Sequence, residues 1–376
     1  MPYWQREILR EQASMALATT YKLDLPKQGH LSALLLQIWG DEATGYGQAG
    51  GDWTIADKIS KIEVIGNGST VIKSLTGKQV QALCTYDQGV MPPTVLRNYA
   101  TNTQFDYFLL NFGRFLYDPD MYLDLERFDN VELWITNTMA AASFPTPYVK
   151  VIGFFGREMS TAGYLGYLRS EEWKQWATVQ DETVYNELPT ELLIRRIMLQ
   201  AIPAVDADYV GNTTPENLMY DIKLALDTGA LLVFDGSMKE LMLENYLDFG
   251  KLLIRSGYNY NNADKGYDVE LGYVIGGSVG IASHDGAVAG SHVTSVAVET
   301  KPTQHNENYQ ADKSAAFVFQ GIAPYKTALF RFDYSYDPIT WLDPNRRKTV
   351  KLDIHTRNAA SAASGSNRII LDRVVR

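Results

Sequence analysis

Several protein classes are excluded by what the sequence lacks. Its 376 residues contain one cysteine, Cys84, which excludes an internal disulfide framework and a thiolate zinc site. The formal charge is −10, with 34 Lys and Arg against 44 Asp and Glu, so we expect no direct nucleic-acid binding. No apolar run approaches the roughly 20 residues that cross a bilayer. The opening residues, MPYWQREILREQ, do not have the layout of a secretory signal. These absences indicate a soluble, folded chain made in a reducing compartment.

The sequence also lacks the patterns that carry catalysis. A metal-binding tandem barrel of the cupin type needs a His-x-His pair followed by a carboxylate, and no such pair occurs. No Gly-x-Gly-x-x-Gly loop and no serine nucleophile elbow is present. The histidines therefore read as surface residues: His30, His284, His292, His305 and His355. We predict no catalytic, cofactor-binding or metal-binding residue, no cofactor and no enzyme activity.

An internal repeat organises what is present. Residues 117–135, YDPDMYLDLERFDNVELWI, match residues 336–354, YDPITWLDPNRRKTVKLDI, at nine of 19 positions. Average composition would give roughly one match. The match continues without a gap from residues 140–153 to residues 359–372. The chain is therefore predicted to contain two copies of one domain.

A second block repeats at an offset near 160. Residues 61–89 lie over residues 220–250, and both predict a strand, a turn, a second strand and a short helix that ends at a glycine, Gly89 or Gly250. The two offsets differ by 59 residues, so the second copy has gained about that many. This predicts a long surface excursion at about 251–326, with a hairpin of its own.

Within the copies, apolar residues alternate with polar ones, as in Val131, Leu133 and Ile135. This period of two, together with an aromatic content of 12%, favours antiparallel sheet. Each copy has about 160 residues without the insertion, which suits an eight-stranded sandwich or jelly roll. The predicted strands are Ala33–Trp39, Ile59–Ile65, Val71–Leu75, Asp106–Asn111, Tyr148–Phe155, Leu193–Leu199, Tyr220–Ala225, Ala230–Phe234, Ala316–Gln320 and Asn367–Asp372.

The predicted organisation has three parts. An amphipathic helix over Tyr3–Ala18 forms an N-terminal helix or arm in residues 1–24. The first jelly roll spans 25–185 and the second spans 186–376, with the insertion at 251–326. The passage 169–191 is expected to hold the last strand of the first domain and a linker.

Two repeated aspartates in each copy have two readings. Asp118 with Asp124, and Asp337 with Asp343, could be paired carboxylates for glycoside chemistry. Because they repeat at turn positions, the favoured reading is structural: Asp-Pro fixes a turn, and Leu-Asp caps a short helix before the next strand.

Two tandem aromatic-rich sandwiches, with a helix after the repeated strand pair and a long loop in one copy, resemble a known family. These are the double jelly-roll major capsid proteins of tailless icosahedral double-stranded DNA viruses, which include adenovirus-like viruses and membrane-containing bacterial and archaeal viruses. The blocks that carry the resemblance are 61–89 with 220–250 and 117–135 with 336–354.

The resemblance implies a function in shell assembly. Three chains would form a homotrimer whose six barrels give a pseudo-hexagonal outline, with the insertion as an outward tower. Implied partners are the chain itself, neighbouring capsomers, penton or minor capsid proteins, and an internal membrane. The implied location is the virion capsid, after synthesis in the host cytoplasm. The alternatives at this level are a carbohydrate-binding or carbohydrate-active tandem β-sandwich, suggested by seven Trp and 23 Tyr, and a bicupin-like enzyme.

Overall fold

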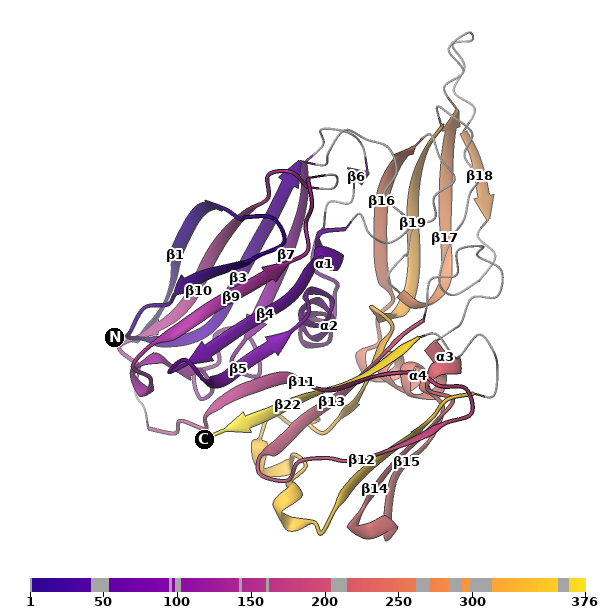
Figure 1. The fold of residues 1–376 in the computed structure, drawn as a ribbon. Coiled ribbons are helices and arrows are strands. Elements are labelled where there is room, and N and C mark those ends of the chain that lie inside the picture. The colour runs from indigo at the N-terminus through magenta and orange to yellow at the C-terminus, as the bar shows by residue number, and fades with distance from the viewer. Residues whose placement is uncertain are drawn as a thin grey trace.

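The fold, seen in a computed structural model, consists of two β-sandwiches and a smaller third sheet (Figure 1). The structure describes residues 2–41, 54–94, 97–98, 103–141, 144–159, 162–203, 215–261, 271–283, 293–297, 313–357 and 365–376. No helix within these ranges is long and apolar enough to cross a membrane.

The first sandwich has two four-stranded layers. One has the order β1-β10-β3-β7, and the other has the order β2-β9-β4-β5. The strands are β1 (Tyr3–Ser14), β2 (Thr20–Asp24), β3 (His30–Asp41), β4 (Ile59–Gly66), β5 (Thr70–Leu75), β7 (Thr103–Asn111), β9 (Val131–Asn137) and β10 (Tyr148–Arg157). A short strand, β8 (Leu123–Asp124), also pairs with β3.

The second sandwich repeats this topology strand for strand. Its layers have the orders β11-β22-β13-β20 and β12-β21-β14-β15. The strands are β11 (Tyr167–Ala177), β12 (Thr183–Glu187), β13 (Leu193–Ile202), β14 (Asp221–Leu226), β15 (Leu231–Gly236), β20 (Thr327–Arg331), β21 (Val350–His355) and β22 (Ser366–Val375). The predicted duplication and the prediction of two eight-stranded sandwiches are confirmed.

The register corrects one detail of the repeat. Phe155 pairs with Leu31, and at the matching bulge of the second sandwich Arg373 pairs with Ile194. The two last strands therefore correspond at an offset of 218, not 219. The preceding loop is one residue shorter in the second copy. Pairing in the sheet fixes the alternation of each strand, whereas a loop tolerates a change of length.

The two equivalent helices are α2 (Gly77–Gln88) and α4 (Met238–Phe249). Each begins with a capping box, at Thr76 and at Ser237, and each ends at a left-handed glycine, Gly89 with φ 70° and Gly250 with φ 65°. The predicted glycine stops are confirmed. The other helical turns are α1 (Ile55–Lys58), α3 (Pro215–Leu218), η1 (Leu125–Arg127), η2 (Asp227–Gly229), η3 (Pro338–Thr340) and η4 (Pro344–Arg346).

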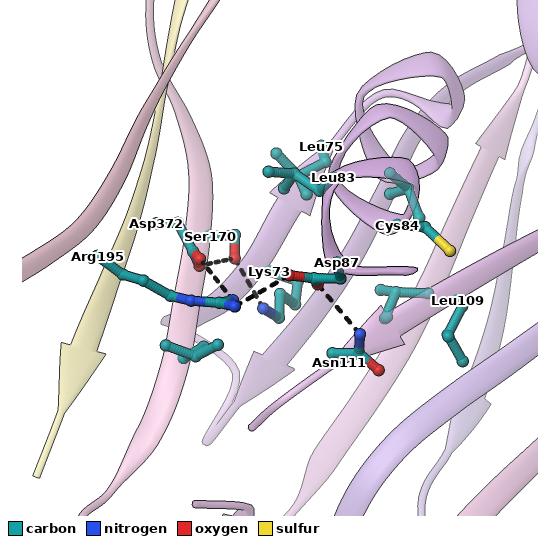
Figure 2. Close-up of a pocket in the computed structure, with 13 residues that line it drawn as sticks. Lys73, Leu75, Leu83, Cys84, Asp87, Leu109, Asn111, Ser170, Arg195 and Asp372 are labelled. Carbon is teal, nitrogen blue, oxygen red and sulfur yellow. Dashed lines mark hydrogen bonds and ion pairs between the residues drawn. The ribbon is translucent and has the colours of Figure 1, made fainter. Parts of the chain in front are cut away.

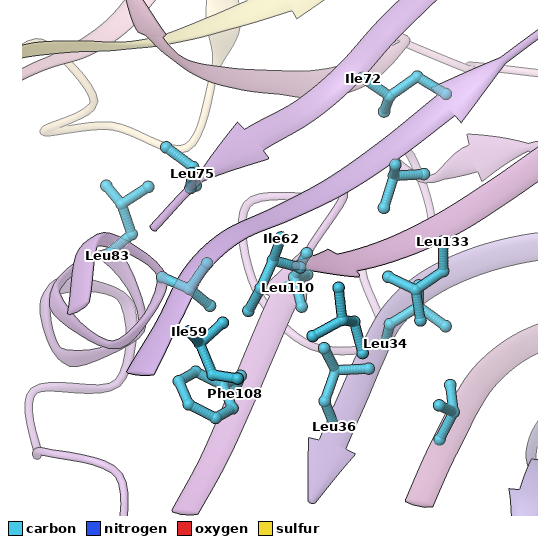
Figure 3. Close-up of a cluster of buried hydrophobic side chains, with 14 of the residues drawn as sticks. Leu34, Leu36, Ile59, Ile62, Ile72, Leu75, Leu83, Phe108, Leu110 and Leu133 are labelled. Carbon is cyan, nitrogen blue, oxygen red and sulfur yellow. The ribbon is translucent and has the colours of Figure 1, made fainter. Parts of the chain in front are cut away.

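Each sandwich has its own apolar core. Inward residues such as Leu34, Phe108 and Leu133 are fully buried in the first core (Figure 3). The matching positions in the second sandwich, such as Leu352, form a second core. The alternation read from the sequence therefore points one face of each strand into a core.

The sandwiches are joined through β5 and β11, which pair in parallel at Lys73–Ser170 and Ser74–Glu171. One layer of each sandwich thereby becomes part of a continuous eight-stranded sheet. In Figure 1 the last strand, β22, lies beside β11 at this junction.

The insertion forms a separate sheet, which is larger than the predicted hairpin. Its strands are β16 (Leu253–Asn261), β17 (Leu271–Ser283), β18 (Val293–Ala297) and β19 (Lys313–Pro324), in the order β18-β17-β19-β16, with β6 (Arg97–Asn98) added from the first copy. The sheet projects beyond the sandwiches (Figure 1). Residues 272–280, which are rich in glycine, are part of β17 and form strand. The polar run 303–313 lies outside the described residues except for Lys313.

The prediction of an N-terminal helix is wrong. Tyr3–Ser14 forms β1, which pairs antiparallel with β10, and β2 pairs with β9. Residues 1–24 thus supply one strand to each layer of the first sandwich. The Glu, Arg and Gln residues gave the segment helix propensity, but backbone pairing with β10 and the packing of Leu9 and Ala13 on the core outweigh that propensity.

The passage 169–191 is also different from the prediction. It contains most of β11 and all of β12, which pair antiparallel with β22 and β21 of the second sandwich. These strands correspond to β1 and β2, so they are the first strands of the second copy rather than the last strand of the first. The partner residues lie 164 to 204 positions further along the chain, so no local pattern identified these two strands.

Candidate functional site

A cluster of buried charged side chains lies where the two sandwiches meet (Figure 2). At the bulge in β13 the register skips Arg195, so its side chain leaves the regular alternation. The corresponding bulge of the first sandwich holds Ser32. Arg195 is 1% exposed and extends from the second sandwich toward the end of α2 in the first.

Arg195 binds carboxylates from both sandwiches. Its Nη2 is 3.0 Å from Asp87 Oδ1 in α2, its Nε is 2.8 Å from Asp333 Oδ2, and its Nη1 is 3.3 Å from Asp372 Oδ2. Nη2 also donates to the carbonyl oxygen of Arg114 at 3.1 Å. One guanidinium thus ties α2 to β22 and to the segment after β20.

Neighbouring cations complete the cluster. Arg196 Nη1 is 2.6 Å from Asp87 Oδ1, and its Nη2 is 2.9 Å from Asp333 Oδ2. Lys73 Nζ donates to Ser170 Oγ at 2.7 Å, and Ser170 donates to Asp372 Oδ1 at 2.6 Å. Arg331 Nε, from a side chain that is 20% exposed, is also 3.1 Å from Asp333 Oδ1. Each of the three carboxylates therefore has at least one cation as a partner, as buried charges require.

In this cluster, burial and the neighbouring opposite charges shift the pKa of each group in opposite directions. Burial would raise the pKa of Asp87, but the charges of Arg195 and Arg196 outweigh it and hold that pKa below its usual value. The same opposition lowers the pKa of Asp333 to about 2. Burial lowers the pKa of Lys73 to about 8, although Asp372 and Asp87 act in the other direction.

The cluster suits a structural role better than catalysis. A lysine with a lowered pKa beside a serine hydroxyl has the composition of a nucleophile and its base. Here Lys73 and Ser170 are 3% and 1% exposed, and the hydroxyl proton is directed at Asp372. A substrate could not reach the serine without separating the two sandwiches. Burial also raises the pKa of the neighbouring Cys84 to about 12, so its thiolate is disfavoured.

A second charged contact crosses the junction nearby. Arg114 forms two bonds to the buried Asp118 and one to Asp120, and its Nη1 donates to the carbonyl oxygen of Tyr336 at 2.7 Å. Asp118 also accepts from backbone amides, including that of Met121. This repeated aspartate therefore fixes a turn and orients an arginine that bridges the two copies.

The other repeated aspartates have the predicted capping role. Asp124 accepts from the amide of Glu126 at 3.2 Å and caps η1, and Asp343 accepts from the amide of Asn345 at 3.1 Å and caps η4. Asp337 caps η3. The structural reading of these residues is confirmed.

The histidines are dispersed. His30 stacks on Tyr122 in the first sandwich, and His355 contacts Thr183 in the second. His284, His292 and His305 lie outside the described residues. Within the part of the chain that the structure describes, no group of three His, Cys, Asp or Glu residues could hold a metal ion.

The tryptophans that the structure describes do not form an exposed platform for a sugar ring. Each of the six in the described residues is at least partly buried: Trp4, Trp39, Trp134, Trp173, Trp176 and Trp341. Trp39 stacks between Phe105 and Tyr148, and Trp341 belongs to a buried cluster. The packing of these side chains does not favour the carbohydrate-binding alternative.

Solved structures match this arrangement over almost the whole chain. The major capsid protein of STIV, Sulfolobus Turreted Icosahedral Virus, superposes with a TM-score of 0.62 at 10% identity, covering 99% of this chain and 97% of that one. This chain has a double jelly-roll fold.

Two further double jelly rolls resemble it. The PBCV-1 virus capsid model gives a TM-score of 0.56 at 10% identity, covering 99% of this chain and 93% of that one. The major capsid protein P2 from Bacteriophage PM2 gives 0.53 at 9% identity, covering 100% and 98%. No family model and no curated protein matches the sequence. At these identities the likeness establishes the fold.

Proposed function

We propose that this double jelly-roll chain is the major capsid subunit of an icosahedral virus and assembles as a homotrimer with a pseudo-hexagonal outline. The observation that carries the proposal is the agreement in fold over 97 to 98% of the STIV and PM2 capsid proteins, which leaves little of those chains unmatched. Two equivalent jelly rolls and a threefold axis give six similar sides, a shape that tiles a shell with one kind of subunit.

The junction supports this function. A shell subunit must hold its two jelly rolls at a fixed angle, since a change of angle would spoil the hexagonal outline. The continuous sheet through β5 and β11 and the buried Arg195 cluster provide that rigidity. The insertion sheet β16–β19 projects from the second jelly roll and would form the outward tower.

The proposal includes the finer expectations of the resemblance. The partners would be neighbouring capsomers, penton or minor capsid proteins, and an internal membrane beneath the shell, and the location would be the virion after synthesis in the host cytoplasm. The formal charge of −10 supports contact with other shell components over contact with the genome. As a structural protein the chain would have no enzymatic activity.

We also propose a revised domain boundary. Because β11 and β12 pair with β22 and β21, the first jelly roll would span β1 to β10 and the second would begin near Tyr167, in place of the boundaries at 24/25 and 185/186.

The test is the assembly state of the full chain. Native mass spectrometry and light scattering are expected to give a trimer of the 42.2 kDa subunit, and electron microscopy is expected to show capsomers with a hexagonal outline. A stable monomer at every concentration would contradict the proposal.

A further inference from the structure

The two jelly rolls of this chain meet at one internal junction, which has two sides. Because the jelly rolls are equivalent, each side of the junction has an equivalent surface on the other jelly roll, and these two surfaces could form the same contact between chains. The matching secondary structure allows each junction residue to be assigned a counterpart. The helix caps Thr76 and Gly89 correspond to Ser237 and Gly250, so α2 and α4 match at an offset of 161.

One face of α2 is buried against the second jelly roll. Gln79 Nε2 donates to Glu172 Oε2 at 2.5 Å and to Gln200 Oε1 at 3.2 Å, and Tyr86 donates its hydroxyl to the carbonyl oxygen of Thr327 at 2.9 Å. Ala82, on the same face, is fully buried. This face of α2 is the helical half of the internal junction.

The matching face of α4 is exposed. The counterparts of Ala82 and Tyr86 are Leu243 and Leu247, which are 46% and 77% exposed. The counterparts of Gln79 and Asp87 are Glu240 and Asp248, which are also exposed. Two leucines on an exposed helix face indicate a surface that a partner covers.

The edge strands show the same difference. β5 pairs with β11 at the junction, whereas its counterpart β15 has one partner, β14, among the described strands. Val233 of β15 is 44% exposed, but its counterpart Ile72 is fully buried. Leu231 and Leu232 are exposed beside it. An apolar edge of this kind favours pairing with another chain.

The surface that receives α2 also has a counterpart. A row across the second jelly roll, Ile370–Met198–Leu329, is buried in the core cluster of the first. The row at the same register in the first jelly roll is Ile152–Leu35–Leu109, which belongs to a separate small apolar cluster.

In the first jelly roll Leu35 and Leu109 are partly exposed and Ile152 is 4% exposed. In the second, Met198 and Leu329 are both 1% exposed. The next row in register carries the polar contacts: Thr327, Gln200 and Arg368 in the second jelly roll correspond to Tyr107, Gln37 and Lys150 in the first.

β1 is the counterpart of β11 on this surface. Both have a bulge at the same point, between Ile8 and Arg10 and between Glu172 and Lys174. Among the described strands β1 pairs with β10 alone. Its outer edge is therefore equivalent to the edge of β11 that pairs with β5.

Charge favours contact between the two outer surfaces. The exposed face of α4 carries three carboxylates, on Glu240, Glu244 and Asp248. The first jelly roll presents exposed Arg6 and Arg10 on β1 and the partly exposed Lys150 on β10, whose Nζ is 2.5 Å from Oε1 of the exposed Glu11 on β1. Within the chain, Arg368 and Gln79 both donate to Glu172 Oε2, so they lie close together. Lys150 is the counterpart of Arg368 in the first jelly roll, so it should lie close to the counterpart of Gln79 from a second copy. That counterpart is Glu240.

We propose that the α4–β15 face of one chain docks on the β1–β10–β3–β7 sheet of a second copy, in the way that α2–β5 docks on β11–β22–β13–β20 within the chain. The contact is heterologous, so it closes into a ring when the rotation between copies allows. This inference rests on the proposed self-assembly and names the surfaces that carry it.

A cysteine pair tests the geometry directly. Tyr86 touches Thr327 within the chain, so Leu247 of one copy should lie beside Tyr107 of the next. The double variant Leu247→Cys, Tyr107→Cys is expected to form disulfides between chains, seen as covalent dimers and trimers on a non-reducing gel. The buried Cys84 does not compete. In the matched control, Leu247→Cys with Ile339→Cys, the second cysteine is 78% exposed on η3, which belongs to neither of the two docking surfaces, and no ladder is expected.

A charge substitution tests the energetics. Leu247→Asp changes an exposed side chain, so folding is retained and is checked by the melting temperature. Loss of a buried contact and burial of a carboxylate should weaken assembly about a hundredfold and give monomers in light scattering. Ile339→Asp, with a similar exposure, should remain assembled.

The outcomes separate the two proposals. Assembled wild type, together with an assembled Leu247→Asp variant and no ladder from the cysteine pair, would overturn this interface while the capsid function stands. A wild type that stays monomeric would overturn the capsid function itself.

Discussion

Replacing Arg195 by methionine should weaken the junction between the two jelly rolls and lower the free energy of unfolding. Methionine has a similar length but removes the guanidinium that binds Asp87, Asp333 and Asp372. The three carboxylates would then share Arg196, Lys73 and the partly exposed Arg331, which binds Asp333. Asp87 and Asp333 keep their bonds to Arg196, so the loss falls mainly on Asp372, which keeps the hydroxyl of Ser170.

The expected magnitude follows from this count. Removing one partner of a buried ion pair costs about 3–5 kcal/mol, because the other charge stays buried and unpaired. With one carboxylate left in that condition, Arg195→Met should lower the free energy of unfolding by about that amount. Adding Asp372→Asn should recover part of the loss, since it removes the unpaired charge.

The assay is denaturant unfolding at pH 7 and one fixed protein concentration, because assembly also contributes to stability. The matched control is Arg331→Met, which removes a bond of 3.1 Å to the same Asp333 but from a side chain that is 20% exposed. The control should cost no more than about 1 kcal/mol. If Arg195→Met cost as little as the control, the view that this cluster holds the junction would be refuted.

Three other predictions concern pH and a helix end. The pKa of Asp333 is about 2 in the folded chain, below its usual 3.8, so the stability that it contributes is present above pH 4 and is lost as the pH falls toward 2. The free energy of unfolding, measured from pH 5 to 2, should therefore fall less steeply in Asp333→Asn than in the wild type. The pKa of Lys73 is about 8 in the folded chain against 10.5, so the unfolded chain holds more protons between these values. Stability should therefore rise over that range relative to Lys73→Met, and equal slopes would contradict the assignment. Gly250→Ala should cost about 1 kcal/mol in thermal unfolding, because φ is 65° and no neighbouring atom lies within 4 Å of the added carbon, whereas Gly250→Asn should cost less.

The junction residues could have been found in part from the sequence. Arg195 and Arg196 interrupt an otherwise apolar strand, and Lys73 stands between Ile72 and Leu75 in another. A charge at a position that the alternation assigns to the interior calls for a buried partner. The sequence gives no indication of which carboxylate that partner is, because Asp87 and Asp372 lie 108 and 177 positions away from Arg195.

The sequence by itself determined the duplication, most strands of the two sandwiches, the glycine ends of the two helices and the place of the insertion. These features depend on local alternation, capping residues and glycines, which are written in short windows of the chain. Only the tertiary structure decided the role of Tyr3–Ser14, because its pairing with β10 overrides its helix propensity. It also decided that β11 opens the second jelly roll, that the two jelly rolls share one sheet, and that Arg195 ties them together. Each of these depends on contacts between residues far apart in the chain, whose positions no local pattern fixes.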